Sequence, residues 1–84
     1  MNRRKLLHKL AQGNLRNVAF SDMVSLIEGF GFSLSRTMGS HHIFIHPGIP
    51  ELINLQKVAG EAKPYQIRQF LRLIEKYNIA LEDS

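Results

Sequence analysis

Three of the four histidines in this 84-residue chain fall within six positions, in the segment Gly39-Ser40-His41-His42-Ile43-Phe44-Ile45-His46-Pro47. The unperturbed pKa of histidine suits proton transfer near neutral pH, and its ring nitrogens also bind metal ions. The segment therefore raises two kinds of chemistry, metal binding and acid–base catalysis, which the local geometry can separate.

The clustered histidines are badly spaced for a shared metal ion. The residues between His42 and His46 are β-branched or aromatic and favour a strand, which Gly39 precedes as a turn residue and Pro47 ends. On a strand, His41 and His42 point to opposite faces, while His42 and His46 lie about 13 Å apart at about 3.3 Å per residue. Zinc ligands lie about 2 Å from the metal, and the chain contains no cysteine. We therefore expect no metal site and no cofactor, with one or two histidines acting singly.

Length and charge restrict the class of protein. A chain of 84 residues forms one small domain with a modest core. Its net charge of +4, from 11 Lys and Arg against 7 Asp and Glu, favours a polyanionic partner. Without cysteine there is no disulfide framework, no signal peptide is visible, and the longest apolar stretches are far shorter than a membrane span. We expect a cytoplasmic protein with no membrane partner.

The apolar spacing predicts the element order helix, helix, three strands, helix. The first helix covers residues 2–12, and the second begins with Ser21 as its N-cap. Strands are predicted at residues 32–36, 41–46 and 52–56, joined by turns at 37–40 and 47–50, as an antiparallel meander. After a loop at 57–63, Pro64 opens the last helix. The sequence thus predicts an α+β fold, with residues 1–19 as an N-terminal helical extension and residues 20–84 as the main domain.

The central strand determines which histidine faces solvent. His42, Phe44 and His46 share one face, and His41 shares the other with two isoleucines. We expect Phe44 to join Phe32 and Leu34 beneath the helices, which leaves His41 on the helix-free face. Such an uncovered face with apolar residues suggests a partner or dimer surface. The inverted assignment stays open, because both faces are apolar enough to be buried.

Several features follow one another in an order that resembles the HicA toxins. These are a helix ending in Gly-Phe, an alternating strand with Arg36, the run Gly39-Ser40-His41-His42, a short strand ending in His46-Pro47, and a final amphipathic helix with arginines. The resemblance covers about residues 20–79. It implies a double-stranded-RNA-binding-domain-like α-β-β-β-α fold, with a three-stranded antiparallel sheet and helices on one face, to which this chain adds an N-terminal helix. It also implies a type II toxin that cleaves mRNA and is neutralised by a HicB-like antitoxin.

The resemblance also implies the site. The catalytic histidine of HicA toxins follows Gly-Ser, which maps onto His41; His42 is the alternative if the strand register is inverted. One histidine can take the proton of the RNA 2′-hydroxyl without a metal ion. The residues predicted to contact RNA are Arg36, Ser40, Lys57, Lys63, Arg68 and Arg72.

Two other functions fit the same fold and charge. One is an RNA-binding module that cuts nothing. The other is a protein-interaction domain, or a homo-oligomer, that uses the open sheet face with Ile43 and Ile45. These isoleucines stand where such toxins often have polar or basic residues.

Overall fold

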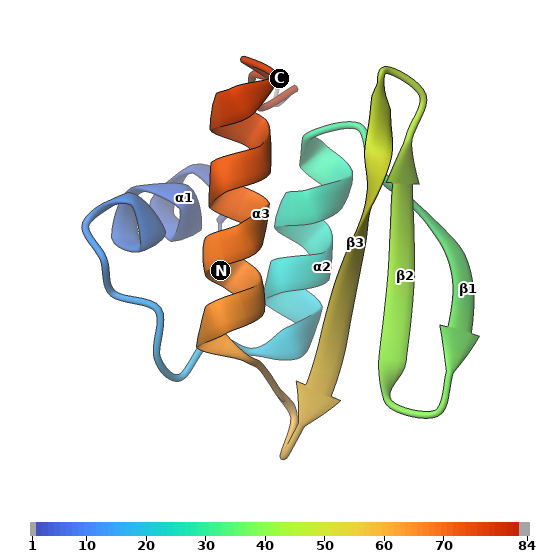
Figure 1. Ribbon diagram of the computed structural model, residues 1–84. Helices are drawn as coiled ribbons and strands as arrows, with labels where there is room; N and C mark the ends of the chain where they lie inside the picture. Colours follow the sequence, from blue (N-terminus) through green and yellow to red (C-terminus); the bar gives the residue numbers. More distant parts are fainter. Residues whose placement is uncertain (1, 83–84) are drawn as a thin grey trace.

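The computed structural model describes residues 2–82, which form three helices and a four-stranded antiparallel sheet (Figure 1). In chain order the elements are α1 (Arg3–Ala11), α2 (Phe20–Gly29), β1 (Ser33–Met38), β2 (His41–His46), β3 (Ile49–Val58), β4 (Glu61–Ala62) and α3 (Pro64–Lys76). The strands lie in the order β1-β2-β3-β4. The predicted α+β class, its α-β-β-β-α order and the extra N-terminal helix are confirmed, and the two-residue β4 is added to the three predicted strands.

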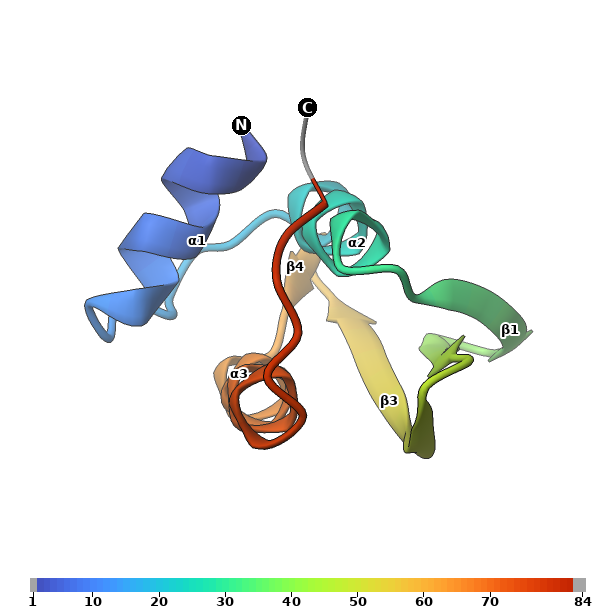
Figure 2. The same cartoon turned by 90° about the horizontal axis from the view of Figure 1, so that it is seen from above.

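The elements are stacked in three layers. Helices α2 and α3 lie side by side between the sheet and α1, and within residues 2–82 no element covers the other face of the sheet (Figure 2). Burial of apolar side chains between these layers is the main source of stability. The core combines residues from every layer, among them Leu10, Met23, Leu26, Phe30, Phe44, Leu55, Ile67 and Phe70.

Helix α1 and the loop after it belong to this same core. Leu6, Leu10, Leu15 and Val18 are all buried there. The helix begins at a side-chain cap, since Asn2 Oδ1 accepts hydrogen bonds from the backbone N–H groups of Arg4 and Lys5 at 2.8 and 3.2 Å. The core is therefore continuous across residue 19, where the sequence suggested a division.

The predicted start of the second helix was wrong. Helix α2 begins at Phe20, and its N-cap residue is Ala19, which makes no side-chain capping bond, rather than Ser21. The reason is backbone pairing outside the helix. The Phe20 N–H donates to the Gly60 carbonyl at 2.9 Å, and Ala19 forms a β-bridge with Glu61. The chain thus enters α2 from a short strand-like contact, which fixes where the helix starts.

The predicted burial of Leu34 was also wrong. Leu34 is 49% exposed, although its partner on the neighbouring strand, Phe44, is only 1% exposed. All six residues of β1 are exposed, because β1 is the edge strand of the sheet and the helices cover β2 and β3 instead. Phe32, just before β1, is buried as expected.

The predicted loop at residues 57–63 contains a hairpin. Strand β3 continues to Val58, and Lys57 and Val58 pair with Ala62 and Glu61 of β4. The two turn residues between the strands, Ala59 and Gly60, have positive φ values of 51° and 77°, as tight two-residue hairpin turns require. Strand β3 therefore extends beyond residues 52–56 at both ends.

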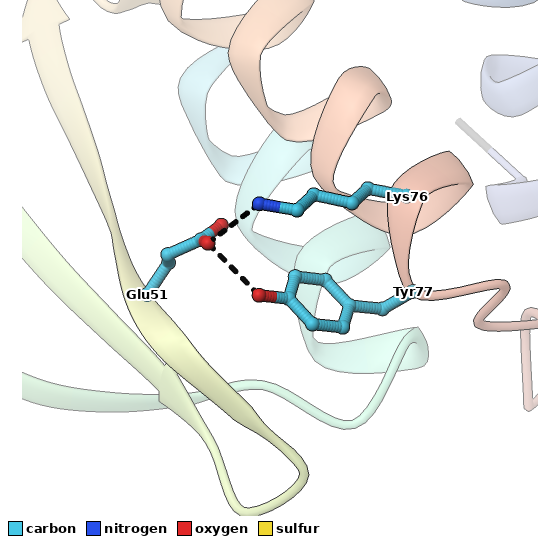
Figure 3. A network of polar contacts seen from close by, with 3 residues as sticks. All are labelled: Glu51, Lys76 and Tyr77. Carbon is cyan, nitrogen blue, oxygen red and sulfur yellow. Dashed lines mark hydrogen bonds and ion pairs between the residues drawn. The ribbon is translucent and has the colours of Figure 1, made fainter.

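A polar contact joins the start of β3 to the end of α3. The Glu51 carboxylate oxygen Oε1 accepts hydrogen bonds from Lys76 Nζ at 3.0 Å and Tyr77 Oη at 2.8 Å (Figure 3). The Lys76 and Tyr77 hydrogen bonds lower the pKa of Glu51, and the same carboxylate raises the pKa of Lys76. We call these three residues the Glu51 clasp.

Candidate active site

His41 is the first residue of β2 and follows directly on a two-residue turn. Gly39 in that turn has a φ of 60°, a left-handed conformation that glycine adopts without steric cost. The turn is tied to β3, because the Ser40 carbonyl accepts a hydrogen bond from the Lys57 N–H at 2.9 Å and Ser40 Oγ accepts one from Gln56 Nε2 at 3.3 Å. The Gly-Ser pair thus holds His41 at a fixed point at the end of the sheet.

The strand register places His41 on the helix-free side of the sheet, which we call the open face. Residues opposite each other in an antiparallel pair share a face, and His41 lies opposite Met38 of β1 and Gln56 of β3. Ile43, two residues along β2, lies opposite Arg36 and Asn54. The open face is therefore made by Arg36, Met38, His41, Ile43, Ile45, Leu52, Asn54 and Gln56.

The next residue, His42, lies on the opposite, helix-covered face. Its ring centroid is 4.7 Å from that of Phe20 on α2, and its Nδ1 donates to the Ser40 carbonyl at 3.2 Å. His46 lies on the same face, with its ring 5.0 Å from that of Phe32. The predicted face assignment is confirmed for His42, Phe44 and His46, and the inverted register is excluded.

His41 has one side-chain partner on the open face. Its Nδ1 lies 3.2 Å from Oδ1 of Asn54 on β3. An amide oxygen only accepts hydrogen bonds, so this contact requires a proton on Nδ1, and in the neutral ring the lone pair is then on Nε2. Within residues 2–82, no hydrogen bond is made to Nε2. His41 thus presents an unoccupied basic nitrogen.

Apolar side chains extend along the open face from His41. Met38 and Ile45 are 55% and 41% exposed. Ile43 is only 9% exposed but lies outside the main core cluster, so its same-face neighbours shield it rather than the helices. Together with Leu52 of β3, which is 59% exposed, these residues make an apolar surface along the open face.

The predicted RNA contacts are distributed over several surfaces. Arg36 lies on the open face opposite Ile43. Arg72 of α3 lines a groove of about 340 Å³ between β3 and α3, and Asn54, the partner of His41, lines it too. Arg36 therefore shares the open face with His41, Ser40 precedes His41 in the chain, and Arg72 lies on α3 in the groove that Asn54 also lines.

The remaining predicted contacts lie elsewhere. Lys57 extends over the Phe20 ring, with Nζ 5.9 Å from its centroid, so it lies on the His42 side of the sheet. Lys63 is the N-cap residue of α3. Arg68 lines a different groove, between α1 and α3, next to Leu7 and Leu10.

Sequence reasoning missed Asn54 and Gln66. Gln66 is 3% exposed, and its side-chain Oε1 accepts a hydrogen bond from the Gln56 N–H at 2.6 Å, beyond the end of the short β4. It thereby satisfies a backbone donor that β4 does not reach. Neither residue belongs to a sequence motif. Asn54 is identified by the pairing of β2 with β3, and Gln66 by the contact of α3 with β3.

Among residues 2–82, no three His, Cys, Asp or Glu side chains gather so that they could hold a metal ion. None of the helices in this described part has the length and apolar character needed to cross a membrane.

Fold and site together define a small α+β protein that presents a histidine, from a Gly-Ser turn, on the open face of a helix-backed sheet. A family model described as the HicA toxin of bacterial toxin–antitoxin systems matches residues 20–75. Since this match covers more than half of the chain, the protein belongs to the HicA toxin family, and membership implies a toxin role with an antitoxin partner. No curated protein and no solved structure matches the chain significantly. The family match begins at the first residue of α2, so α1 lies outside it.

Proposed function

We propose that this toxin is a metal-independent endoribonuclease that cleaves mRNA, with His41 as its single catalytic histidine. The observation that carries the proposal is the position of His41 directly after Gly39-Ser40, on the open face, with its Nε2 without a partner among residues 2–82. Among the three histidines of β2, only His41 is accessible from this face. His42 and His46 are packed against aromatic rings on the other side.

The proposed chemistry uses the nucleophile that RNA itself contains. His41 Nε2 accepts the proton of a 2′-hydroxyl while that oxygen bonds to the adjacent phosphorus. The bond from phosphorus to the 5′-oxygen breaks, and that oxygen takes a proton from solvent. The products are a 2′,3′-cyclic phosphate and a 5′-hydroxyl end. Proton transfer of this kind contributes about 10²–10⁴-fold to a rate, which predicts a slow enzyme.

Cationic and polar residues near His41 are proposed to position the phosphate backbone. Arg36 shares the open face, Ser40 precedes His41 in the chain, and Arg72 lies in the groove that Asn54 also lines. Fixed cations favour the negative charge that develops on the phosphoryl oxygens in the transition state. Lys57, Lys63 and Arg68 complete the proposed set of phosphate contacts around the molecule.

The proposed partner is a HicB-like antitoxin that covers the open face. The exposed apolar side chains of Met38, Ile45 and Leu52 favour contact with another protein there. An antitoxin seated on these residues would exclude RNA from His41. The same apolar surface is also the observation that favours the second candidate, a protein-interaction domain or homo-oligomer without catalysis.

The test is to induce the wild-type chain and His41→Ala in a bacterial host whose own toxin–antitoxin loci do not interfere. We expect the wild type to arrest growth and shorten cytoplasmic mRNA, and His41→Ala to do neither at equal protein level. Co-expression of the antitoxin encoded beside the gene should restore growth. Arrest with intact mRNA would reject nuclease activity, and RNA binding without cleavage would instead favour the non-catalytic module.

A further inference from the structure

The contact between His41 and Asn54 joins two strands far apart in the sequence. Nδ1 of His41 and Oδ1 of Asn54 are 3.2 Å apart, although 13 residues separate them. Asn54 lies opposite Ile43, so it is diagonal to His41 across the β2–β3 pair, within reach of side chains on one face. The amide is therefore held by the strand pairing and not by a flexible loop.

A histidine acts as a proton acceptor through one nitrogen only when the other carries the proton. The neutral ring has two tautomers, and a hydrogen bond to one nitrogen selects between them. Because Asn54 Oδ1 accepts from Nδ1, the contact favours the tautomer whose lone pair is on Nε2. It also limits rotation of the ring.

We propose that Asn54 is the positioning residue of this site, which holds His41 with Nδ1 protonated and Nε2 free to accept the 2′-hydroxyl proton. The proposal rests on the proposed ribonuclease function. It assigns Asn54 no contact with the reacting atoms. Once the ring becomes an imidazolium, the same oxygen still accepts from Nδ1, so the contact persists through the proton transfer.

The surroundings of Asn54 favour this role over a purely structural one. The Asn54 side chain is exposed, so its hydrogen bond adds little to the stability of the fold. No backbone group is satisfied by it, in contrast to Gln66, which accepts from the Gln56 N–H. What Asn54 fixes is the orientation of one histidine.

The experiment compares the full-length wild type with Asn54→Leu and Asn54→Asp. Leucine has a similar volume but no acceptor, whereas aspartate keeps an acceptor oxygen at the same position. Asn14→Leu, in the exposed loop after α1, is the matched control for the same exchange at a distant site. Circular dichroism melting shows whether each variant is folded. The tautomer of His41 is read from ¹⁵N NMR of its ring nitrogens at mildly alkaline pH, and kcat and KM are measured on an mRNA fragment.

We expect the wild type and Asn54→Asp to show a protonated Nδ1, and Asn54→Leu to shift toward the tautomer with Nε2 protonated. Asn54→Leu should lower kcat roughly tenfold, the kinetic equivalent of one hydrogen bond, with little change in KM or melting temperature. Asn14→Leu should match the wild type. An unchanged tautomer in Asn54→Leu would overturn the proposal whether or not RNA is cleaved. A shifted tautomer with an unchanged kcat would overturn it as well. A wild type that cleaves no RNA would reject the proposed function itself, and the catalytic role of Asn54 with it.

Discussion

The ring of His42 lies 4.7 Å from the ring of Phe20, at an interplanar angle of 57°, so the first residue of α2 packs onto the strand residue that follows His41. Two adjacent histidines thereby serve different purposes. His42 packs against Phe20 on the helix-covered face of β2. Because adjacent residues of a strand point to opposite faces, His41 lies on the open face. The contact also allows the two candidate catalytic histidines to be distinguished by experiment, because His42 contributes to packing against the helices and His41 does not.

His42→Ala is expected to lower the stability of the fold, because it removes the contact with Phe20. Aromatic pairs contribute about 0.5–1.5 kcal/mol beyond their buried area. Urea unfolding followed by circular dichroism measures the change. The control is His41→Ala, for which we expect a change within about 0.5 kcal/mol, as for other surface substitutions. Equal stability losses in the two variants would contradict the face assignment.

RNA affinity is expected to fall with rising salt, because phosphate contacts release counterions. Each phosphate neutralised contributes a slope of about −0.7 in log K against log salt for single strands. Arg72→Ala should reduce the slope by about that amount, since Arg72 lies in the groove next to Asn54. Arg16→Ala, at an exposed position in the loop after α1 and outside the proposed phosphate contacts, is the matched comparison and should leave the slope unchanged. An RNA affinity that does not change as the salt concentration rises would contradict the proposed phosphate contacts.

The Glu51 clasp is expected to make the stability of the fold depend on pH. The pKa of Glu51 lies below its ordinary value of 4.5 in the folded chain, chiefly because Lys76 and Tyr77 donate hydrogen bonds to the carboxylate. Because this pKa is lower in the folded chain than in the unfolded chain, the ionised carboxylate of Glu51 stabilises the fold. This stabilisation is complete above the pKa of Glu51 in the unfolded chain and is lost as the pH falls through its pKa in the folded chain. Glu51→Gln should therefore melt below the wild type at neutral pH, and the two melting curves should converge at acid pH. A difference that persists in acid would show that the carboxylate charge is not involved.

Cleavage is expected to continue after divalent ions are removed. The histidines of β2 are divided between the two sheet faces, and those that share a face are about 13 Å apart along the strand, too far for shared ligation. The measurement is the rate of mRNA cleavage before and after treatment with EDTA. A rate that disappears with EDTA and returns with zinc or magnesium would contradict the single-histidine mechanism.

Periodicity and turn residues were sufficient to predict the elements nearest the site. The strand from His41 to His46 and the helix start at Pro64 agree with the structure, because alternation and proline act within a few residues. The face assignment of His41 followed from the same alternation. Ser21 was wrongly predicted as the N-cap because a β-bridge between Ala19 and Glu61, 42 residues further along the chain, fixes the start of α2. Leu34 was misplaced because alternation does not reveal that its strand lies at the edge of the sheet.

The partner of His41 could not be predicted in the same way. The contact with Asn54 depends on the register between β2 and β3, which shifts between Phe44 and His46. A shift of one residue would turn the Asn54 side chain to the helix-covered face. Strand β3 also begins at Ile49 rather than Leu52, because Pro47, Gly48 and Pro50 in this stretch predicted a turn where the strand already starts. Long-range register, and not local propensity, determines this part of the site.

Whether His41 is the catalytic residue is tested by cleavage of a purified mRNA by the wild type, His41→Ala and His42→Ala, each shown by circular dichroism to be folded at the assay temperature. We expect the wild type and His42→Ala to leave 2′,3′-cyclic phosphate ends, and His41→Ala to leave the RNA intact. A folded His41→Ala that still cleaves at the wild-type rate would contradict the catalytic role of His41.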